Sequence, residues 1–394
     1  MAPTLDPRGA PPTVYGWGGG TTEATGPVTT KRFEIASHSI SEAMKDAIEE
    51  GVFPDAELLV AHHEEILFHK SYGRARKGSL FDIASLTKPI CTATLTMLFH
   101  AKELIKLEDT VYQWLAGARL PFHRQITVEM LLHHFAGYIA WQPYYRELPL
   151  SMIGTEEGRD FIFQECLREP LIHAPGEKTV YSDIGSILLG KILEEAGDHP
   201  LDILFQEYIA APLKLHDTFF IPTHTHSARA NRRFIPTQDC PWRGRILKGE
   251  VDNANAYALG GVAGHAGLFS TASDLHIFLK AFTQSLSGKN DWIPPETVRA
   301  FFDFEKAWSR KENDTFVGGW NLITPGRSSS GHSFSKRSIG HLAYTGCSLW
   351  IDLEKEVWVI LLTNRVHPSM TNEKIKSFRP QLHDLIMKEL ILNV

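Results

Sequence analysis

The stretch that decides the fold is "FDIASLTKPICTATLTMLFH", which runs from Phe81 to His100. Its first half is apolar and indicates a strand, whereas its second half is apolar with the spacing of a helix. Ser85 and Lys88 lie at the junction, three residues apart. Side chains at this spacing share one face of a helix, with about 5–6 Å between their Cβ atoms. The stretch therefore predicts a strand that leads into a buried helix and sets a hydroxyl beside an amine.

The segments on both sides of this stretch show where other strands and helices lie. Residues 56–73, "AELLVAHHEEILFHKSYG", predict two strands around a polar turn, after an amphipathic helix that ends near Gly51. From about 105 to 260, helical patterns dominate, with Pro- and Gly-containing loops between them. Residues 341–365, "HLAYTGCSLWIDLEKEVWVILLTNR", predict two β-rich runs around a charged turn, and a final helix follows.

Strands at both ends of the chain and helices in the middle predict an α+β fold. We expect an antiparallel sheet that is flanked by helices, built from both ends of the chain, and interrupted by an inserted helical subdomain. In residue numbers, a flexible segment covers 1–32 and a discontinuous α/β domain covers 33–104 and 262–394. The inserted, mainly helical subdomain covers 105–261.

Composition excludes several classes of protein. The chain has 394 residues, of which 43% are hydrophobic and 22% charged, and a formal net charge of −6. This profile is typical of a soluble globular protein and gives no basic surface for nucleic acid. No apolar run is long enough to span a bilayer, and the N-terminal residues lack the apolar core of a signal peptide. We therefore expect a cytoplasmic protein, with an oligomeric state that the sequence does not fix.

Cysteines and histidines give no sign of a bound metal. The four cysteines are far apart and form no CxxC pair, which argues against a disulfide scaffold and a zinc knuckle. His224 and His226 lack the helical spacing and the acidic partner that a metal site requires. We expect no metal and no cofactor.

The Ser85–Lys88 pair suits nucleophilic catalysis. A lysine in this position can take the serine proton if burial and the helix N-terminus lower its pKa. Free backbone N–H groups of the first turn can stabilise an oxyanion that forms beside the serine. The spacing alone is weak, because Ser333 and Lys336 share it in a Gly- and Ser-rich loop. The alternative is a helix-capping serine beside an exposed lysine.

Two further stretches favour catalysis over capping. "PGEKTVYSDIGSILLG" places Tyr181 and Asp183 two residues apart just before a helix, where a phenol and a carboxylate can enter one cleft. The alternative is a core tyrosine followed by capping residues. Residues 339–352, "IGHLAYTGCSLWID", look like an edge strand that can present a backbone N–H to a substrate carbonyl. The alternative is an ordinary core strand.

Together the three stretches resemble the serine β-lactamase and penicillin-binding protein superfamily, in its branch of class C β-lactamases, DD-peptidases and esterases. The order fits: S-x-x-K early, Y-x-N/D in the middle, and a K/H-T-G-type strand near the end. The resemblance covers roughly residues 33–390 and includes "LLHHFAGY", which is similar to the family's LLxHxSGL segment. It implies a β-lactamase/transpeptidase-like fold.

The resemblance also assigns roles. It makes Ser85 the nucleophile, Lys88 its proton acceptor, and Tyr181 the group that passes a proton to the leaving group. The oxyanion-hole donors would be the backbone N–H groups of Ser85 and Tyr344. His341 stands where β-lactamases carry a lysine and many esterase-like members a histidine.

Two departures from the family pattern bear on the substrate. The strand reads His341-Leu342-Ala343 and lacks the threonine and glycine that help bind a β-lactam carboxylate. Asp183 replaces the usual asparagine, and its charge would steady the Lys88 ammonium or suit a substrate with a cationic or amide donor group.

Residues 241–271, "PWRGRILKGEVDNANAYALGGVAGHAGLFST", are similar to a segment in relatives that accompany peptidoglycan recycling, including muramyl-peptide amidases and penicillin-binding-protein-like carboxypeptidases. Those relatives read GEVHDENA where this chain reads GEVDNANA, so the histidine is missing. His265 remains, flanked by glycines that let the loop approach a ligand. It is a candidate substrate-binding residue, or else a loop-packing histidine.

These observations predict a serine hydrolase that forms an acyl-enzyme on an amide or ester. The first expectation is an amidase or peptidase acting on a small-molecule or peptide substrate such as a murein fragment. A promiscuous carboxylesterase or a weak β-lactamase is the enzymatic alternative. A catalytically silent relative that binds a peptidoglycan ligand is the alternative of another class.

Overall fold

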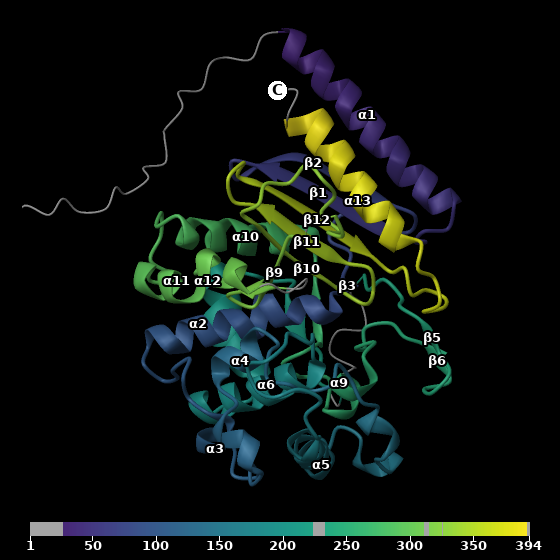
Figure 1. The fold of residues 1–394 in the computed structure, drawn as a ribbon. Coiled ribbons are helices and arrows are strands. Elements are labelled where there is room, and N and C mark those ends of the chain that lie inside the picture. Colours follow the sequence, from purple (N-terminus) through teal and green to yellow (C-terminus); the bar gives the residue numbers. More distant parts are fainter. Residues whose placement is uncertain (1–26, 224–232, 311–314, 325, 392–394) are drawn as a thin grey trace, which may run out of the picture.

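The computed structural model describes residues 27–223, 233–310, 315–324 and 326–391. Its largest sheet is antiparallel and has seven strands in the order β2-β1-β12-β11-β10-β9-β8 (Figure 1). The strands are β1 (Ala56–His62), β2 (Glu65–Tyr72), β8 (Phe316–Val317), β9 (Trp320–Leu322), β10 (Ser338–Leu342), β11 (Ser348–Asp352) and β12 (Val357–Thr363). Because β1 pairs with β12, the two ends of the chain build one sheet. The predicted sheet is confirmed.

The central strands are buried on both faces, which explains their continuous apolar sequences. Leu58 and Val60 of β1 belong to the apolar core on one face of the sheet, and Leu59 and Ala61 belong to the core on the other. This division follows from the alternation of side chains along a strand. The sheet therefore separates two cores.

One face of the sheet is covered by α1 (Pro27–Glu49) and α13 (Ile375–Ile386), which continues as the π-helix η8 (Met387–Ile391). The opposite face is covered by α10 (Ala272–Leu286), which contacts β1 and β12 (Figure 1). Helices thus flank the sheet on both sides, as the sequence predicts.

The first helix begins earlier than expected. α1 starts at Pro27, so residues 27–32, predicted to be flexible, are helical; residues 1–26 lie outside the described residues. Proline is well suited to a first helical turn, where its missing N–H leaves no bond unmade. Because it starts at Pro27, α1 is long, and it contacts α13.

Most of the remaining helices lie below the sheet in Figure 1. They are α2 (Thr94–Ala101), α3 (Val111–Trp114), α4 (Val128–Leu132), α5 (Glu156–Arg168), α6 (Asp183–Gly197), α7 (Leu201–Phe205), α8 (Ala211–Leu213), α9 (Ala254–Ala258), α11 (Pro295–Phe301) and α12 (Phe304–Ser309). β3 (Phe81–Asp82), β7 (Leu268–Ser270) and β4 (Phe219–Phe220) form a three-stranded sheet, and β5 (Asp239–Cys240) pairs with β6 (Arg245–Ile246). The division into domains stays a prediction.

The segment expected to be an edge strand is a hairpin. β10 pairs with β11 on one side and with β9 on the other, and residues 343–347 form the turn between β10 and β11. Gly346, with a φ of 99°, lies in this turn, where a side chain would be strained. The expectation of an edge strand was wrong because β9 pairs with the other side of β10, so that β10 has a neighbouring strand on each side.

In the described part of the chain, no helix combines the length and the apolar character needed to cross a membrane.

Candidate active site

Ser85 lies on a tight turn between a strand and a helix. It is the middle residue of the 3₁₀ turn η1 (Ala84–Leu86), which follows β3 and leads into the π-helix η2 (Lys88–Ala93) and then α2. Ala84 has a φ of +43°, a conformation that is uncommon for a residue with a side chain. The Thr87 hydroxyl donates to the Ala84 carbonyl at 2.6 Å and fixes the turn. The predicted strand-to-helix junction is confirmed.

The structure brings Lys88 to Ser85. The buried Lys88 Nζ lies 3.2 Å from Ser85 Oγ and also donates to the His265 carbonyl oxygen at 3.0 Å. The other pair with this spacing is different, because the Lys336 Nζ lies 3.9 Å above the Trp308 ring. Of the two S-x-x-K sequences, only Ser85–Lys88 forms a serine–amine contact among the described residues.

The start of α6 brings the second motif to the same amine. Lys88 Nζ lies 2.8 Å from Asp183 Oδ1 and 4.9 Å from the centroid of the Tyr181 ring. The intervening Ser182 is the N-cap of α6, and its hydroxyl accepts a hydrogen bond from the Gly185 N–H at 3.4 Å. Ser182 therefore fixes the start of the helix, and its two neighbours approach Lys88.

The charge on Lys88 differs from the sequence-based expectation. Burial disfavours the ammonium, but the Asp183 carboxylate and the Tyr181 phenol outweigh burial and raise the pKa of Lys88 above its usual value. We expected a lowered pKa and an uncharged amine. That expectation was wrong because Asp183 forms an ion pair with the amine. The other expectation, that the Asp183 charge would steady the Lys88 ammonium, agrees with this ion pair. The resting Lys88 is an ammonium that donates to Ser85.

The two partners of Lys88 keep opposite protonation states. Burial raises the pKa of Tyr181, although interactions with Lys88 and Ser85 partly oppose the increase, so the phenol is protonated at neutral pH. Burial also acts to raise the pKa of Asp183, but the charge and the hydrogen bond of Lys88 outweigh it and the pKa is lowered. The site therefore contains an anion, an ammonium and a neutral phenol in contact.

Two buried histidines lie next to this group. Burial and the Lys88 charge lower the pKa of His341 to about 3, and burial lowers that of His265 to about 4, so both rings are neutral. His341 Nδ1 bonds to the Leu342 carbonyl at 2.9 Å and His265 Nε2 to Asn253 Oδ1 at 3.0 Å. In each ring the other nitrogen has no partner among the described residues and is left as an acceptor.

Tyr344 lies in the turn of the β10–β11 hairpin. The next residue, Thr345, donates its hydroxyl to the Asp82 carbonyl at 2.9 Å, three residues before Ser85, and β10 packs beside η1. The Tyr344 side chain is partly exposed and its hydroxyl bonds to Met370 Sδ. The oxyanion role of the Tyr344 backbone N–H stays a prediction.

Sequence patterns missed several residues at the site. The His134 ring packs 4.6 Å from Tyr181 and its Nδ1 accepts from the Ser182 N–H at 3.2 Å, whereas its motif indicated packing at a helix end. Phe316 stacks on Tyr181 at 6.3 Å between ring centroids. A polar residue close to a motif serine, such as Asp82 three positions before Ser85, is a signal in the sequence that could have indicated a further site residue.

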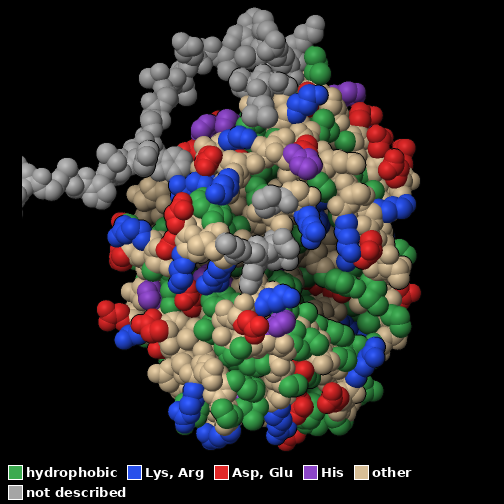
Figure 2. Space-filling view, in the orientation of Figure 1, with side chains coloured by type: hydrophobic (Ala, Val, Ile, Leu, Met, Phe, Trp, Pro, Cys, Tyr) green, Lys and Arg blue, Asp and Glu red, His purple; other side chains and the backbone are tan. Residues whose placement is uncertain are grey.

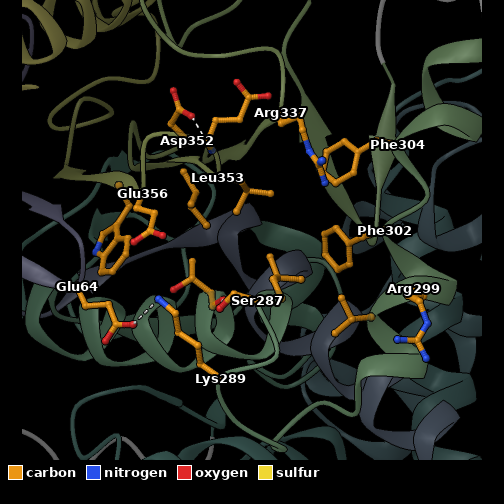
Figure 3. Close-up of a pocket in the computed structure, with 16 residues that line it drawn as sticks. Glu64, Ser287, Lys289, Arg299, Phe302, Phe304, Arg337, Asp352, Leu353 and Glu356 are labelled. Atoms are coloured by element: carbon orange, nitrogen blue, oxygen red, sulfur yellow. Dashed lines mark hydrogen bonds and ion pairs between the residues drawn. The ribbon is translucent and has the colours of Figure 1, made fainter. Parts of the chain in front are cut away.

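The described part of the chain has hollows at separate places on its surface. Figure 2 shows one near the position of β3, with hydrophobic side chains gathered below it. A cavity of about 610 Å³ lies elsewhere, at the end of the sheet formed by the β11–β12 turn, and its lining includes Phe302, Phe304 and Arg337 (Figure 3). None of the predicted site residues lines this cavity. His224 and His226 lie outside the described residues.

Comparisons with known proteins identify the family of the chain. The sequence model of the family described as "Beta-lactamase" matches residues 40–379. The "Putative D-alanyl-D-alanine carboxypeptidase" of Escherichia coli strain K12 is 27% identical over 352 residues, which cover 80% of this chain and 79% of that protein.

Two solved structures share the fold with a TM-score of 0.67 each. One is "EstCE1, a hydrolase with promiscuous acyltransferase activity", which is 20% identical, with 90% of this chain and 100% of that chain covered. The other is the octameric penicillin-binding protein homologue from Pyrococcus abyssi, which is 18% identical, with 90% and 77% covered. Since the family match spans most of the sequence, the chain belongs to the beta-lactamase family and is a serine hydrolase.

Proposed function

We propose that this chain is a peptidase or amidase that cleaves an amide bond of a peptidoglycan fragment through an acyl-enzyme on Ser85. The observation that carries the proposal is the contact of one amine with the serine and with a carboxylate: Lys88 Nζ lies 3.2 Å from Ser85 Oγ and 2.8 Å from Asp183 Oδ1. The base is within hydrogen-bond reach both of the nucleophile and of the group that orients the base.

Acylation begins when the Lys88–Asp183 pair has lost one proton, because the resting ammonium has no lone pair with which to act as a base. Ser85 Oγ attacks the substrate carbonyl carbon as its proton passes to Lys88. The C–N bond then breaks, and the protonated Tyr181 gives its proton to the leaving amine and regains one from Lys88. The atoms balance: the serine ester forms, the amine departs with the serine proton, and the base is restored.

The negative charge of the tetrahedral intermediate needs donors that are already in place. The N–H groups of Ser85 and Tyr344 would supply them, and one such donor is worth about 10²–10³ in rate. Thr345 holds the turn that carries Tyr344 to the strand before Ser85. Water then attacks the acyl-enzyme with the same base and releases the acid.

One feature supports an amide substrate. The Escherichia coli relative is named for carboxypeptidase action on D-alanyl-D-alanine, and the aligned part covers 80% of this chain. A D-alanyl-D-alanine peptide is therefore the first substrate to test.

A carboxylesterase is the second candidate. The His341-Leu342-Ala343 sequence lacks the threonine and glycine that support a β-lactam carboxylate, and EstCE1 shares the fold. An ester leaving group also needs less protonation than an amine. Because the strand lacks this threonine and glycine, β-lactam hydrolysis should be weak.

The first experiment is covalent labelling with a fluorophosphonate probe, read by intact mass and peptide mapping. We expect one adduct, on Ser85, and none in Ser85→Ala, which should remain folded by circular dichroism. Ser333→Ala is the matched control, because Ser333 also precedes a lysine by three residues, and it should label at the wild-type rate. Absence of any adduct on Ser85 of the wild-type protein would support the silent relative and overturn the proposal.

A substrate panel follows on the same proteins. Muramyl peptides, D-alanyl-D-alanine peptides, short-chain p-nitrophenyl esters and a penicillin are compared by kcat/KM. A higher kcat/KM for release of D-alanine or of an amine from the peptides than for cleavage of the esters supports the peptidase. Turnover of esters alone supports the esterase.

A further inference from the structure

Asp82 is the meeting point of three segments that carry site residues. It is a buried residue of β3, three positions before Ser85. One segment is η1, which carries Ser85. Another is residues 249–256, the loop that holds His265 through Asn253, and the last is the 343–347 turn, which carries Tyr344.

The Asp82 carboxylate uses its two oxygens on two of these segments. Oδ1 accepts the Ala84 N–H at 2.8 Å, and Oδ2 accepts the Asp252 N–H at 2.6 Å. Ala84 is the residue whose φ of +43° sets the angle at which Ser85 leaves the strand. The first contact therefore stabilises an uncommon backbone conformation directly before the nucleophile.

The second contact leads to Lys88. Asn253 follows Asp252, and its Oδ1 holds His265 Nε2 at 3.0 Å. The His265 carbonyl in turn accepts from Lys88 Nζ at 3.0 Å. The main chain of Asp82 is held as well, because its carbonyl accepts the Thr345 hydroxyl at 2.9 Å.

We propose that Asp82 is a positioning residue for the Ser85 reaction: its ionised carboxylate holds the nucleophile turn and the 249–256 loop in the geometry that turnover requires. This inference rests on the proposed function. A protonated carboxyl group cannot do the same work, because its O–H oxygen is a poor acceptor and its proton would face an N–H donor. Protonation thus releases one of the two segments.

The charges around Asp82 place the protonation of its carboxylate near neutral pH. Burial and the Asp252 carboxylate raise the pKa of Asp82 to about 7, opposed by the Asp252 and Ala84 N–H groups and by the Arg243 charge. The other titratable group beside it is the Cys347 thiol of the hairpin, whose pKa burial raises to about 11, so it stays neutral. Burial raises the pKa of Asp252 as well, and the charges of Arg243 and Arg365 oppose this increase. Asp82 therefore gains its proton as the pH falls below about 7.

The test is the second-order rate of fluorophosphonate labelling of Ser85 between pH 5 and 9. In wild-type protein, two protons must leave below pH 7, one from Asp82 and one from the Lys88–Asp183 pair, and only one above it. The slope of log rate against pH should change from two to one near pH 7. Asp82→Asn should show a slope of one throughout, with a rate at pH 8 that is lower by up to about 100-fold.

Two further variants keep the inference testable if Asp82→Asn does not fold. Asp252→Asn retains the N–H that bonds to Asp82 but removes the negative charge, so the change of slope should move to lower pH. Asp274→Asn is the matched control, because Asp274 is also buried and accepts a backbone N–H, from Asp217, but lies on α10. It should leave the change of slope in place.

The outcomes separate the two proposals. No adduct on Ser85 at any pH would mean that the proposed function is wrong. An adduct whose slope changes at the same pH in wild-type protein and in Asp252→Asn would mean that Asp82 has no positioning role. A shifted slope in Asp252→Asn with an unshifted slope in Asp274→Asn supports it.

Discussion

Asp183 determines how much charge the Lys88 amine carries. Burial alone would lower the pKa of Lys88, and the Asp183 carboxylate 2.8 Å away reverses that effect. A base that holds its proton too tightly is active only at high pH. The ion pair that orders the site therefore limits its reactivity at neutral pH.

Replacing Asp183 with asparagine tests this balance. The amide keeps a hydrogen-bond acceptor for Lys88 but removes the charge, so burial should dominate and lower the pKa of the amine. We expect the rise of the labelling rate with pH to begin at lower pH in Asp183→Asn, with faster labelling than wild type at pH 7. The measurement is the pH profile of fluorophosphonate labelling, and a rise that moves to higher pH would contradict the argument.

Sequence reasoning at the scale of single residues succeeded where contacts are local. Ser85 and Lys88 are three positions apart on one turn, so their spacing predicts their contact. Asp82 and Asp252 are 170 positions apart and meet only because β3 and the 249–256 loop fold together. No periodicity encodes that contact, and the same holds for the ion pair that sets the pKa of Lys88.

The contact between α6 and the 261–267 loop is set by two glycines. A Cβ on Gly190 would lie 2.8 Å from the Gly264 Cα, which is closer than real contacts allow. Gly264 accepts a bond from the Thr92 hydroxyl, and its neighbour His265 accepts from Lys88. The absence of side chains at this contact therefore allows the loop to reach the catalytic amine.

We expect Gly190→Ala to displace this loop. Overpacking should lower the free energy of unfolding by about 1–3 kcal/mol and slow Ser85 labelling. Gly185→Ala is the matched control in the same helix, since its Cβ would be 3.6 Å from the nearest atom, an ordinary contact. Urea unfolding and labelling rates of the two variants are compared. Equal rates of Ser85 labelling in both variants would show that the position of the 261–267 loop does not depend on the close contact between Gly190 and Gly264.

Secondary-structure elements with strong patterns could be predicted, and elements that depend on pairing could not. β1 and β12 have continuous apolar sequences, because both of their faces are buried. β8 and β9 have two and three residues, too few for a pattern, and exist because β9 pairs with β10. The 343–347 turn was not predicted, because it lies within an apolar run that resembles one long strand.

At the scale of the molecule, the sheet separates the candidate site from one of the two apolar cores. Ser85, Lys88 and Asp183 all belong to the layer of helices that includes α2 and α6 (Figure 1). On the other face, α1 and α13 enclose a separate core with Leu58 and Val60. A change in that second core can reach the site through the sheet, or through Arg379 of α13, which donates to the Gly346 carbonyl at 2.7 Å in the 343–347 turn.

Truncating a side chain in the α1 core should therefore reduce stability without changing the chemistry. Ile40 of α1 is fully buried in that core, so Ile40→Ala should lower the free energy of unfolding by about 2–5 kcal/mol. Ile35→Ala is the matched control on the same helix, because Ile35 is 56% exposed, and it should change stability by less than about 0.5 kcal/mol. Both variants should label Ser85 at the wild-type rate while folded. A slower rate in Ile40→Ala under conditions where it remains folded would show that the two layers are coupled.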